Sequence, residues 1–136
     1  MKGSYLLTIK LEKNETISAG KLGNLELKKG FYVYIGSALN GLEQRINRHL
    51  RKNKKIHWHI DYLLQNAEII DVFYKENKNR EECLIAKTLD KKLNSIPNFG
   101  CSDCNCNSHL FYGTYKEIID AVNTTNMKAY PLNEKS

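Results

Sequence analysis

Two periodicities of apolar residues divide the chain into predicted strands and helices. Runs of alternating or β-branched apolar residues predict five strands, at 4–11, 24–28, 31–38, 68–74 and 110–112. Apolar residues spaced three or four apart predict four helices, at about 41–52, 57–66, 80–93 and 115–122. Because strands and helices interleave, the pattern predicts an α/β (α+β) fold with a small central mixed or antiparallel sheet flanked by helices.

The predicted helices have distinct apolar stripes. These consist of Leu42, Ile46 and Leu50 in the first helix, Ile60, Leu63 and Leu64 in the second, and Leu84, Ile85, Leu89 and Leu93 in the third. In the first helix Arg45, Arg48 and Arg51 form a separate, cationic face. The polar segment from residue 123 to residue 136 is predicted to be a frayed tail.

Length and composition limit the class of protein. With 136 residues, the chain has the size of a single domain over 1–136, with a core at about 3–122. No apolar run approaches the roughly 20 residues of a membrane-spanning helix, so no membrane partner is expected. The first residues lack the pattern of a secretory signal, so the chain is expected in the cytoplasm with reduced cysteines. A net charge of +6 is compatible with a polyanionic partner but does not identify one.

Several spaced segments carry a family resemblance. Gly3-Ser4-Tyr5 begins the first predicted strand, Tyr34-Ile35-Gly36 ends a later strand, and Arg45 follows on the next helix. Together with GFYVYIGSA, RINRHLR, KIHWHIDYLL and FGCSDCNCNSHLFY, they resemble the GIY-YIG nuclease superfamily. The closer resemblance, over about residues 3–122, is to its small, largely archaeal branch of Uri-like endonucleases labelled DUF123. It implies a GIY-YIG endonuclease-like fold.

The resemblance also implies a set of catalytic residues, namely Tyr5, Tyr34, Arg45, His49 and Glu82. In the superfamily the two tyrosines face one active site, the arginine contacts the scissile phosphate, and the glutamate binds one divalent metal ion. Glu81 is the alternative metal ligand. Two features depart from the family pattern. Residues 12–30 widen the spacing between the tyrosine motifs, and Ser37 stands where some repair-type members have a lysine.

The chemistry of phosphodiester hydrolysis is consistent with these residue types. The reaction needs a cation on the phosphate oxygens, a base near the attacking water and stabilisation of the leaving oxygen. Glu82 with Mg²⁺ or Mn²⁺ and the planar guanidinium of Arg45 would meet the first need. His49 is four residues from Arg45 and is expected to reach the same phosphate. Tyr34 is a candidate base, and Tyr5 a candidate for positioning the water or Tyr34, although either tyrosine could be a core aromatic.

A basic segment follows the predicted active-site strand. We expect it to follow a nucleic-acid backbone, of DNA or RNA, through Arg48, Arg51, Lys52, Lys54, Lys55 and His57. The alternative is a solubilising surface. His57 and Asp61 could instead pair across one helical turn, and Trp58 could belong to the core. No base-reading motif is evident, so selectivity for structure is expected rather than for sequence.

The cysteine-rich loop is a second candidate site. Cys101, Cys104, Cys106 and His109 supply four zinc-type ligands within nine residues. Their compressed spacing favours a structural loop with reduced thiols over a zinc site, but zinc stays open.

These observations lead to one principal functional hypothesis. It is a metal-dependent endonuclease that hydrolyses phosphodiester bonds in DNA, of a type used in DNA repair, with a protein partner for targeting as an open option. The alternative is a non-catalytic nucleic-acid-binding module with the same fold.

Overall fold

A computed structural model describes residues 2–38, 40–52, 54–56, 58–77, 81–100 and 107–132 of the protein. Its centre is a six-stranded sheet of order β6-β7-β4-β1-β5-β8, in which every neighbouring pair is antiparallel. The strands are β1 (Gly3–Leu11), β4 (Gly30–Ala38), β5 (Glu68–Glu76), β6 (Asn94–Ser95), β7 (Leu110–Gly113) and β8 (Lys128–Ala129). The predicted class is confirmed, with the sheet antiparallel rather than mixed.

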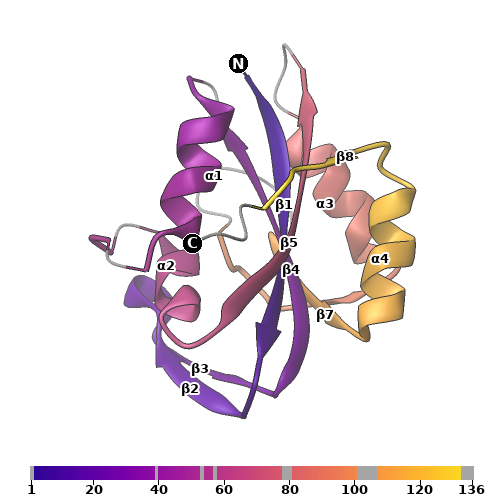
Figure 1. Ribbon diagram of the computed structural model, residues 1–136. Coiled ribbons are helices and arrows are strands. Elements are labelled where there is room, and N and C mark those ends of the chain that lie inside the picture. The colour runs from indigo at the N-terminus through magenta and orange to yellow at the C-terminus, as the bar shows by residue number, and fades with distance from the viewer. Residues whose placement is uncertain are drawn as a thin grey trace.

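Helices cover both faces of this sheet, which gives three layers (Figure 1). The helices α1 (Leu42–Leu50) and α2 (His59–Leu64) lie on one face, and α3 (Glu82–Asp90) and α4 (Tyr115–Asn123) lie on the other. The alternation of side chains along a strand separates the two cores. In β1, Tyr5, Leu7 and Ile9 belong to the core beneath α1 and α2, whereas Leu6 belongs to the core beneath α3 and α4.

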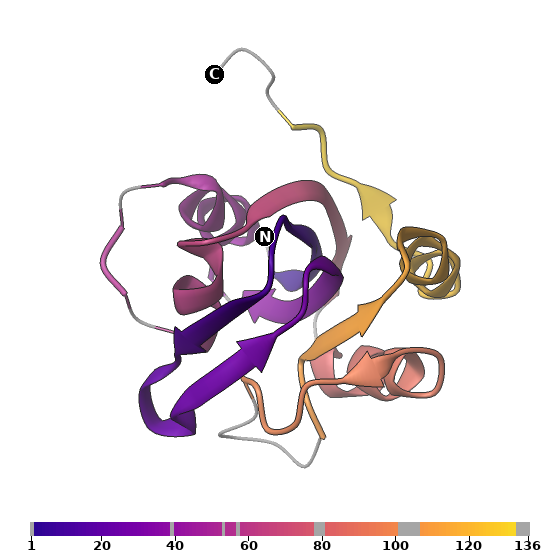
Figure 2. The same cartoon turned by 90° about the horizontal axis from the view of Figure 1, so that it is seen from below.

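The segment 12–30, which separates the two tyrosine motifs, contains both strands of a small second sheet. Strands β2 (Glu15–Ser18) and β3 (Asn24–Leu27) pair antiparallel across the short 3-10 turn Gly20–Leu22. Figure 2, the view from below, also shows this hairpin beside the ends of β1 and β4. Ile17 and Leu27 are buried in the same core as Ile60 and Leu63 of α2. The hairpin therefore extends the core on the α1 and α2 side.

Two sequence predictions are wrong in this part of the molecule. Leu84 was assigned to the apolar stripe of its helix but is 65% exposed, because Glu82, Ile85, Ala86 and Leu89 form the buried face of α3. The tail after residue 123 is not frayed over its described part. The main-chain N–H of Tyr130 donates to the Val72 carbonyl (2.8 Å), next to the β5–β8 pairing.

The remaining predicted elements are found, with ends displaced by up to three residues, although β2, β6 and β8 were missed. Within the described ranges, no helix has the length and apolar character to cross a membrane.

Candidate active site

Strand pairing brings the two motif tyrosines to one face of the sheet. Tyr5 of β1 lies opposite Gly36 of β4, and Leu7 lies opposite Tyr34. Tyr5 and Tyr34 are therefore diagonal neighbours, a relation in which aromatic side chains can touch. A Cβ atom on Gly36 would stand 2.5 Å from the Tyr5 ring. Because Gly36 has no side chain, the Tyr5 ring can occupy the space next to it.

His49 of α1 completes a buried cluster with these tyrosines. The Tyr5 hydroxyl oxygen lies 2.7 Å from His49 Nε2, and the ring of Tyr34 meets the His49 ring at a centroid distance of 6.2 Å. The sequence placed His49 on one helix face with Arg45, directed at a phosphate. Instead, His49 is 2% exposed and contacts Tyr5, which makes it a partner of the tyrosine.

Burial sets the protonation states of this cluster. It lowers the pKa of His49 to about 3 and raises the pKa of Tyr5 and of Tyr34 well above 10. Arg45 opposes the rise of the Tyr5 pKa, both by its charge and by donating a hydrogen bond to the tyrosine. All three rings are therefore neutral at pH 7. The Tyr5 hydroxyl and the neutral imidazole of His49 share this hydrogen bond, and the tautomer of the imidazole sets which of them donates.

The pKa of His49 predicts a dependence of stability on pH. The folded-state pKa (about 3) lies below the ordinary value of 6.5, so folding favours the neutral ring. The stabilisation is complete above pH 6.5 and is lost as the pH falls toward 3. Between pH 6.5 and 4.5 this group alone should lower the free energy of unfolding by about 2 to 3 kcal/mol. Urea unfolding at several pH values measures it.

His49→Gln is the matched control for this prediction, because an amide can accept from Tyr5 but does not titrate. Carboxylates and His59 also titrate in this range, so the difference between the two proteins is the relevant quantity. The unfolding free energy of His49→Gln should fall less steeply between pH 6.5 and 4.5. Parallel curves would contradict a buried, neutral His49.

The glutamate predicted to bind metal lies at the start of α3, a helix of the opposite face of the sheet, and its charge reaches both tyrosines. Glu82 is 7% exposed, and its charge raises the pKa of both Tyr5 and Tyr34. Its neighbour Glu81 is directed elsewhere and forms an ion pair with Lys75 (3.4 Å). Within the described ranges, no three His, Cys, Asp or Glu side chains are grouped as a metal site. A single carboxylate suits Mg²⁺ or Mn²⁺, which retain several waters and take oxygen ligands from a substrate.

Arg45 connects the buried cluster to an open pocket on the protein surface. The volume of this pocket is about 820 Å³. The Arg45 Nη1 donates to the Ser37 carbonyl (3.0 Å) at the end of β4, and its guanidinium lowers the pKa of Tyr5. The described lining of this pocket, hereafter the basic groove, contains arginines and amides and no acidic side chain. It consists of Ser37, Asn40, Gly41, Gln44, Arg45, Asn47, Arg48 and Arg51.

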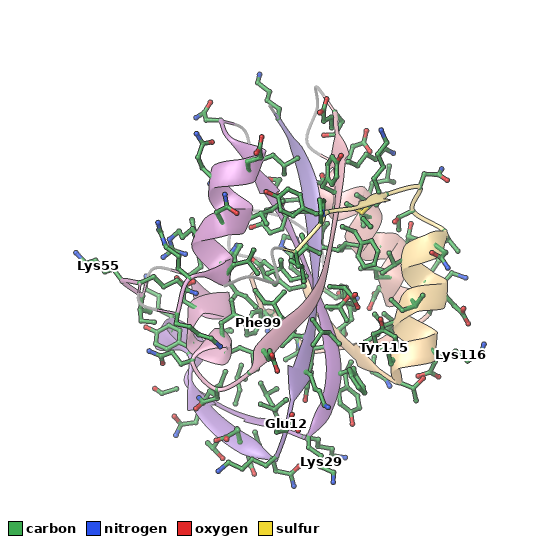
Figure 3. The ribbon with its side chains drawn as sticks, viewed as in Figure 1. Glu12, Lys29, Lys55, Phe99, Tyr115 and Lys116 are labelled. Atoms are coloured by element: carbon green, nitrogen blue, oxygen red, sulfur yellow. The ribbon has the colours of Figure 1, made fainter. Side chains whose placement is uncertain are left out.

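The other basic residues of the predicted nucleic-acid surface fall into two groups. Arg51, Lys52 and Lys55 are exposed, and Lys55 projects away from the body of the protein in Figure 3. Lys54 instead donates to the carbonyls of His49 (2.9 Å) and Arg51 (2.6 Å) and so caps the end of α1. Lys54 therefore contributes to the helix as well as to the charge of the surface.

Arg48 is held by an acidic partner from α2. Its Nη1 and Nη2 each lie 3.0 Å from an oxygen of Asp61, which is fully buried. Asp61 thus meets Arg48, whereas the suggested partner His57 lies outside the described residues. The sequence did not identify this pair, because thirteen positions separate the two residues.

Two further aromatic residues, Phe99 and His59, adjoin the site, and Phe99 was not singled out by the sequence. Phe99 is fully buried, and its ring meets those of Tyr34 (6.3 Å between centroids) and His59 (5.7 Å). In Figure 3 it lies in the interior on the α1 and α2 side. The Gly100 N–H donates to His59 Nδ1 (3.2 Å), which attaches the loop to α2. No local periodicity signals these contacts.

The predicted zinc ligands lie mostly outside the described residues. Cys101, Cys104 and Cys106 belong to the undescribed segment 101–106. His109 is buried beside Gly100, and its main-chain N–H donates to the Phe99 carbonyl (2.8 Å). The zinc hypothesis stays a prediction.

Fold and site together define an α+β protein in which two tyrosines of the antiparallel sheet and a histidine of α1 lie beside a basic groove, with a buried glutamate at the start of α3. Over residues 4–130 the chain matches the model of the family described as domain of unknown function DUF123. The chain belongs to this family. No curated protein and no solved structure matches it.

Proposed function

We propose that this protein is a metal-dependent endonuclease of the GIY-YIG type, which hydrolyses phosphodiester bonds in DNA and selects structure rather than sequence. The observation that supports this most is the contact of Tyr5 and Tyr34, from β1 and β4, with His49 of α1, within reach of the Glu82 charge. Arg45 links this cluster to the basic groove. A site for phosphate chemistry requires such a combination of cation, carboxylate and proton carriers.

In the proposed reaction, each side chain acts after the side chains around the closed cluster have moved aside for the substrate. Arg45 binds a non-bridging oxygen of the scissile phosphate and offsets charge that develops on it. The Tyr5 oxygen accepts a proton from the attacking water while the Tyr5 proton moves to His49 Nε2, and Tyr34 orients the water. The oxygen of that water bonds to phosphorus as the bond from phosphorus to the leaving oxygen breaks.

Glu82 would hold the divalent ion, which lowers the pKa of the attacking water and neutralises phosphate charge. The charged residues near His49 affect the proton transfer from Tyr5 to His49. Asp61 favours protonation of His49, whereas Arg48, Lys54 and Arg45 oppose it. A proton can therefore rest on His49 only briefly before it passes to the leaving oxygen or to solvent.

The basic groove supports a phosphodiester as the ligand. Arg45 and Arg48 of α1 and Arg51, which directly follows this helix, line it together with amide side chains. Arginine forks match phosphate oxygens in geometry, and exposed positive charge attracts any nucleic-acid backbone. Because the sequence shows no base-reading motif, the proposal favours recognition of DNA structure.

One observation favours a second candidate, a nucleic-acid-binding module without turnover. Tyr5 is 1% exposed and Tyr34 is 8% exposed, so the cluster is closed in this conformation. A bound substrate would have to displace surrounding side chains before it could reach both tyrosines.

Cleavage assays with branched, nicked and plain duplex DNA test the proposal. Cleavage with Mg²⁺ or Mn²⁺ and none with EDTA is expected, most efficiently on a branched or nicked substrate. Arg45→Ala should lower the rate on the order of 10²- to 10³-fold, because it removes a preorganised cation. Lys116→Ala removes an exposed charge on the opposite face of the sheet and should leave the rate unchanged. Binding without cleavage of any substrate would refute the enzyme and support the second candidate.

A further inference from the structure

The side chain of Trp58 forms a platform for two arginines of α1. The Cζ atoms of Arg45 and Arg48 lie 4.6 Å and 4.4 Å from the centroid of the indole ring. Both distances are within the range of cation–π attraction. Trp58 stands directly before α2, so the platform joins the start of α2 to the exposed face of α1.

Asp61 fixes the position of this platform through hydrogen bonds. Its carboxylate accepts two hydrogen bonds from Arg48 and one from the main-chain N–H of Trp58 (2.9 Å). Arg48 also donates to the Lys55 carbonyl (2.7 Å). A buried carboxylate is retained only when such partners compensate its charge. Asp61 therefore fixes Arg48 and the position of the indole at once.

The two arginines consequently differ in their availability to a ligand. The charge of Arg48 is matched by Asp61, and its side chain is 19% exposed. Arg45 lines the basic groove, donates to the Ser37 carbonyl and lowers the pKa of Tyr5, so its guanidinium lies between the groove and the tyrosine cluster. Stacking on Trp58 restricts the rotamers of the Arg45 side chain before a ligand binds. Less conformational entropy of this side chain is then lost on binding.

We propose that Trp58 and Asp61 are positioning residues that orient Arg45 toward a phosphodiester, and that Arg48 acts as the link between them rather than as a nucleic-acid ligand. This inference rests on the proposed function in one respect, that Arg45 binds phosphate. It assigns no chemical step to Trp58, Asp61 or Arg48.

The first test uses fluorescence, because Trp58 is the only tryptophan in the chain. In EDTA, binding of a short nicked duplex should change the emission of Trp58 as the Arg45 guanidinium meets phosphate. The change should disappear in Arg45→Ala and persist in Lys116→Ala. A duplex that binds, by an independent anisotropy measurement, without any change in emission would overturn the proposal. So would a change that persists in Arg45→Ala.

The second test separates positioning from general stability through steady-state cleavage. Trp58→Leu should lower kcat on the order of 10- to 100-fold, the cost of a misplaced contact, with a smaller effect on KM. Trp58→Phe keeps an aromatic face and should recover most of the loss. Equal losses in both variants, or none, would overturn the proposal. If Trp58→Leu fails to fold, the fluorescence test in the native protein and the rate of Trp58→Phe still decide.

The two tests distinguish failure of this inference from failure of the proposed function. If no DNA is cleaved but the emission change depends on Arg45, the endonuclease proposal fails and the positioning of Arg45 for phosphate stands. If cleavage depends on Arg45 but not on Trp58 or Asp61, the endonuclease stands and the inference fails. Asp61→Asn, which keeps an acceptor for the Trp58 N–H, should reduce kcat in the same way as Trp58→Leu.

Discussion

Replacing Glu82 by glutamine is expected to reduce DNA cleavage on the order of 10³-fold or more, because the change removes the charge that would hold the metal ion. Glutamine matches glutamate in size, so the packing of the α3 face with Ile85 and Ala86 should be kept. Single-turnover rates at saturating Mg²⁺ and Mn²⁺ measure the effect, and circular dichroism checks the fold.

The neighbouring residue supplies the matched control for this prediction. Glu81→Gln removes the same charge one position earlier, where the carboxylate faces Lys75. A partly exposed ion pair contributes at most about 1 kcal/mol to stability, so Glu81→Gln should cleave at nearly the native rate. The reverse outcome would make Glu81 the metal ligand. Native rates in both variants would remove the acidic residues at the start of α3 from the mechanism.

Gly36→Ala is expected to damage both stability and activity, although it adds only one methyl group. The added carbon would stand 2.5 Å from the Tyr5 ring, which has no free space because Tyr5 is 1% exposed. Overpacking of this kind costs about 1 to 3 kcal/mol. Since the ring must move, the hydrogen bond between Tyr5 and His49 should be lost. A displacement near 1 Å would lower the cleavage rate on the order of 10²-fold.

A double-mutant cycle tests the cause of that loss. In a Tyr5→Ala background the ring is absent, so Gly36→Ala should destabilise the protein much less than it does in the native background. Chemical denaturation of the four proteins gives the coupling free energy. Additive effects would mean that Gly36 is required for a reason other than the space for Tyr5.

The site itself was only partly predictable from the sequence. The motif residues Tyr5, Tyr34, Arg45, His49 and Glu82 were identified through the family resemblance, and the structure brings them together. The direction of His49 was not predictable, because helical spacing places it near the arginine face but does not show that it contacts a strand 44 positions earlier. Leu84 was misassigned for a similar reason, since the buried face of α3 is rotated to include Glu82.

The sequence by itself determined the periodic elements of this protein, because the hydrophobic repeat of a strand or helix depends on neighbouring residues alone. It also determined the class of the fold, since strands and helices interleave. Only the tertiary structure decided how Arg45 and Arg48 divide their roles. That division depends on Trp58 and Asp61, which approach α1 through the chain's return in α2. The charge of Arg48 is neutralised and that of Arg45 faces the groove because of contacts between distant segments. No local sequence pattern encodes these contacts.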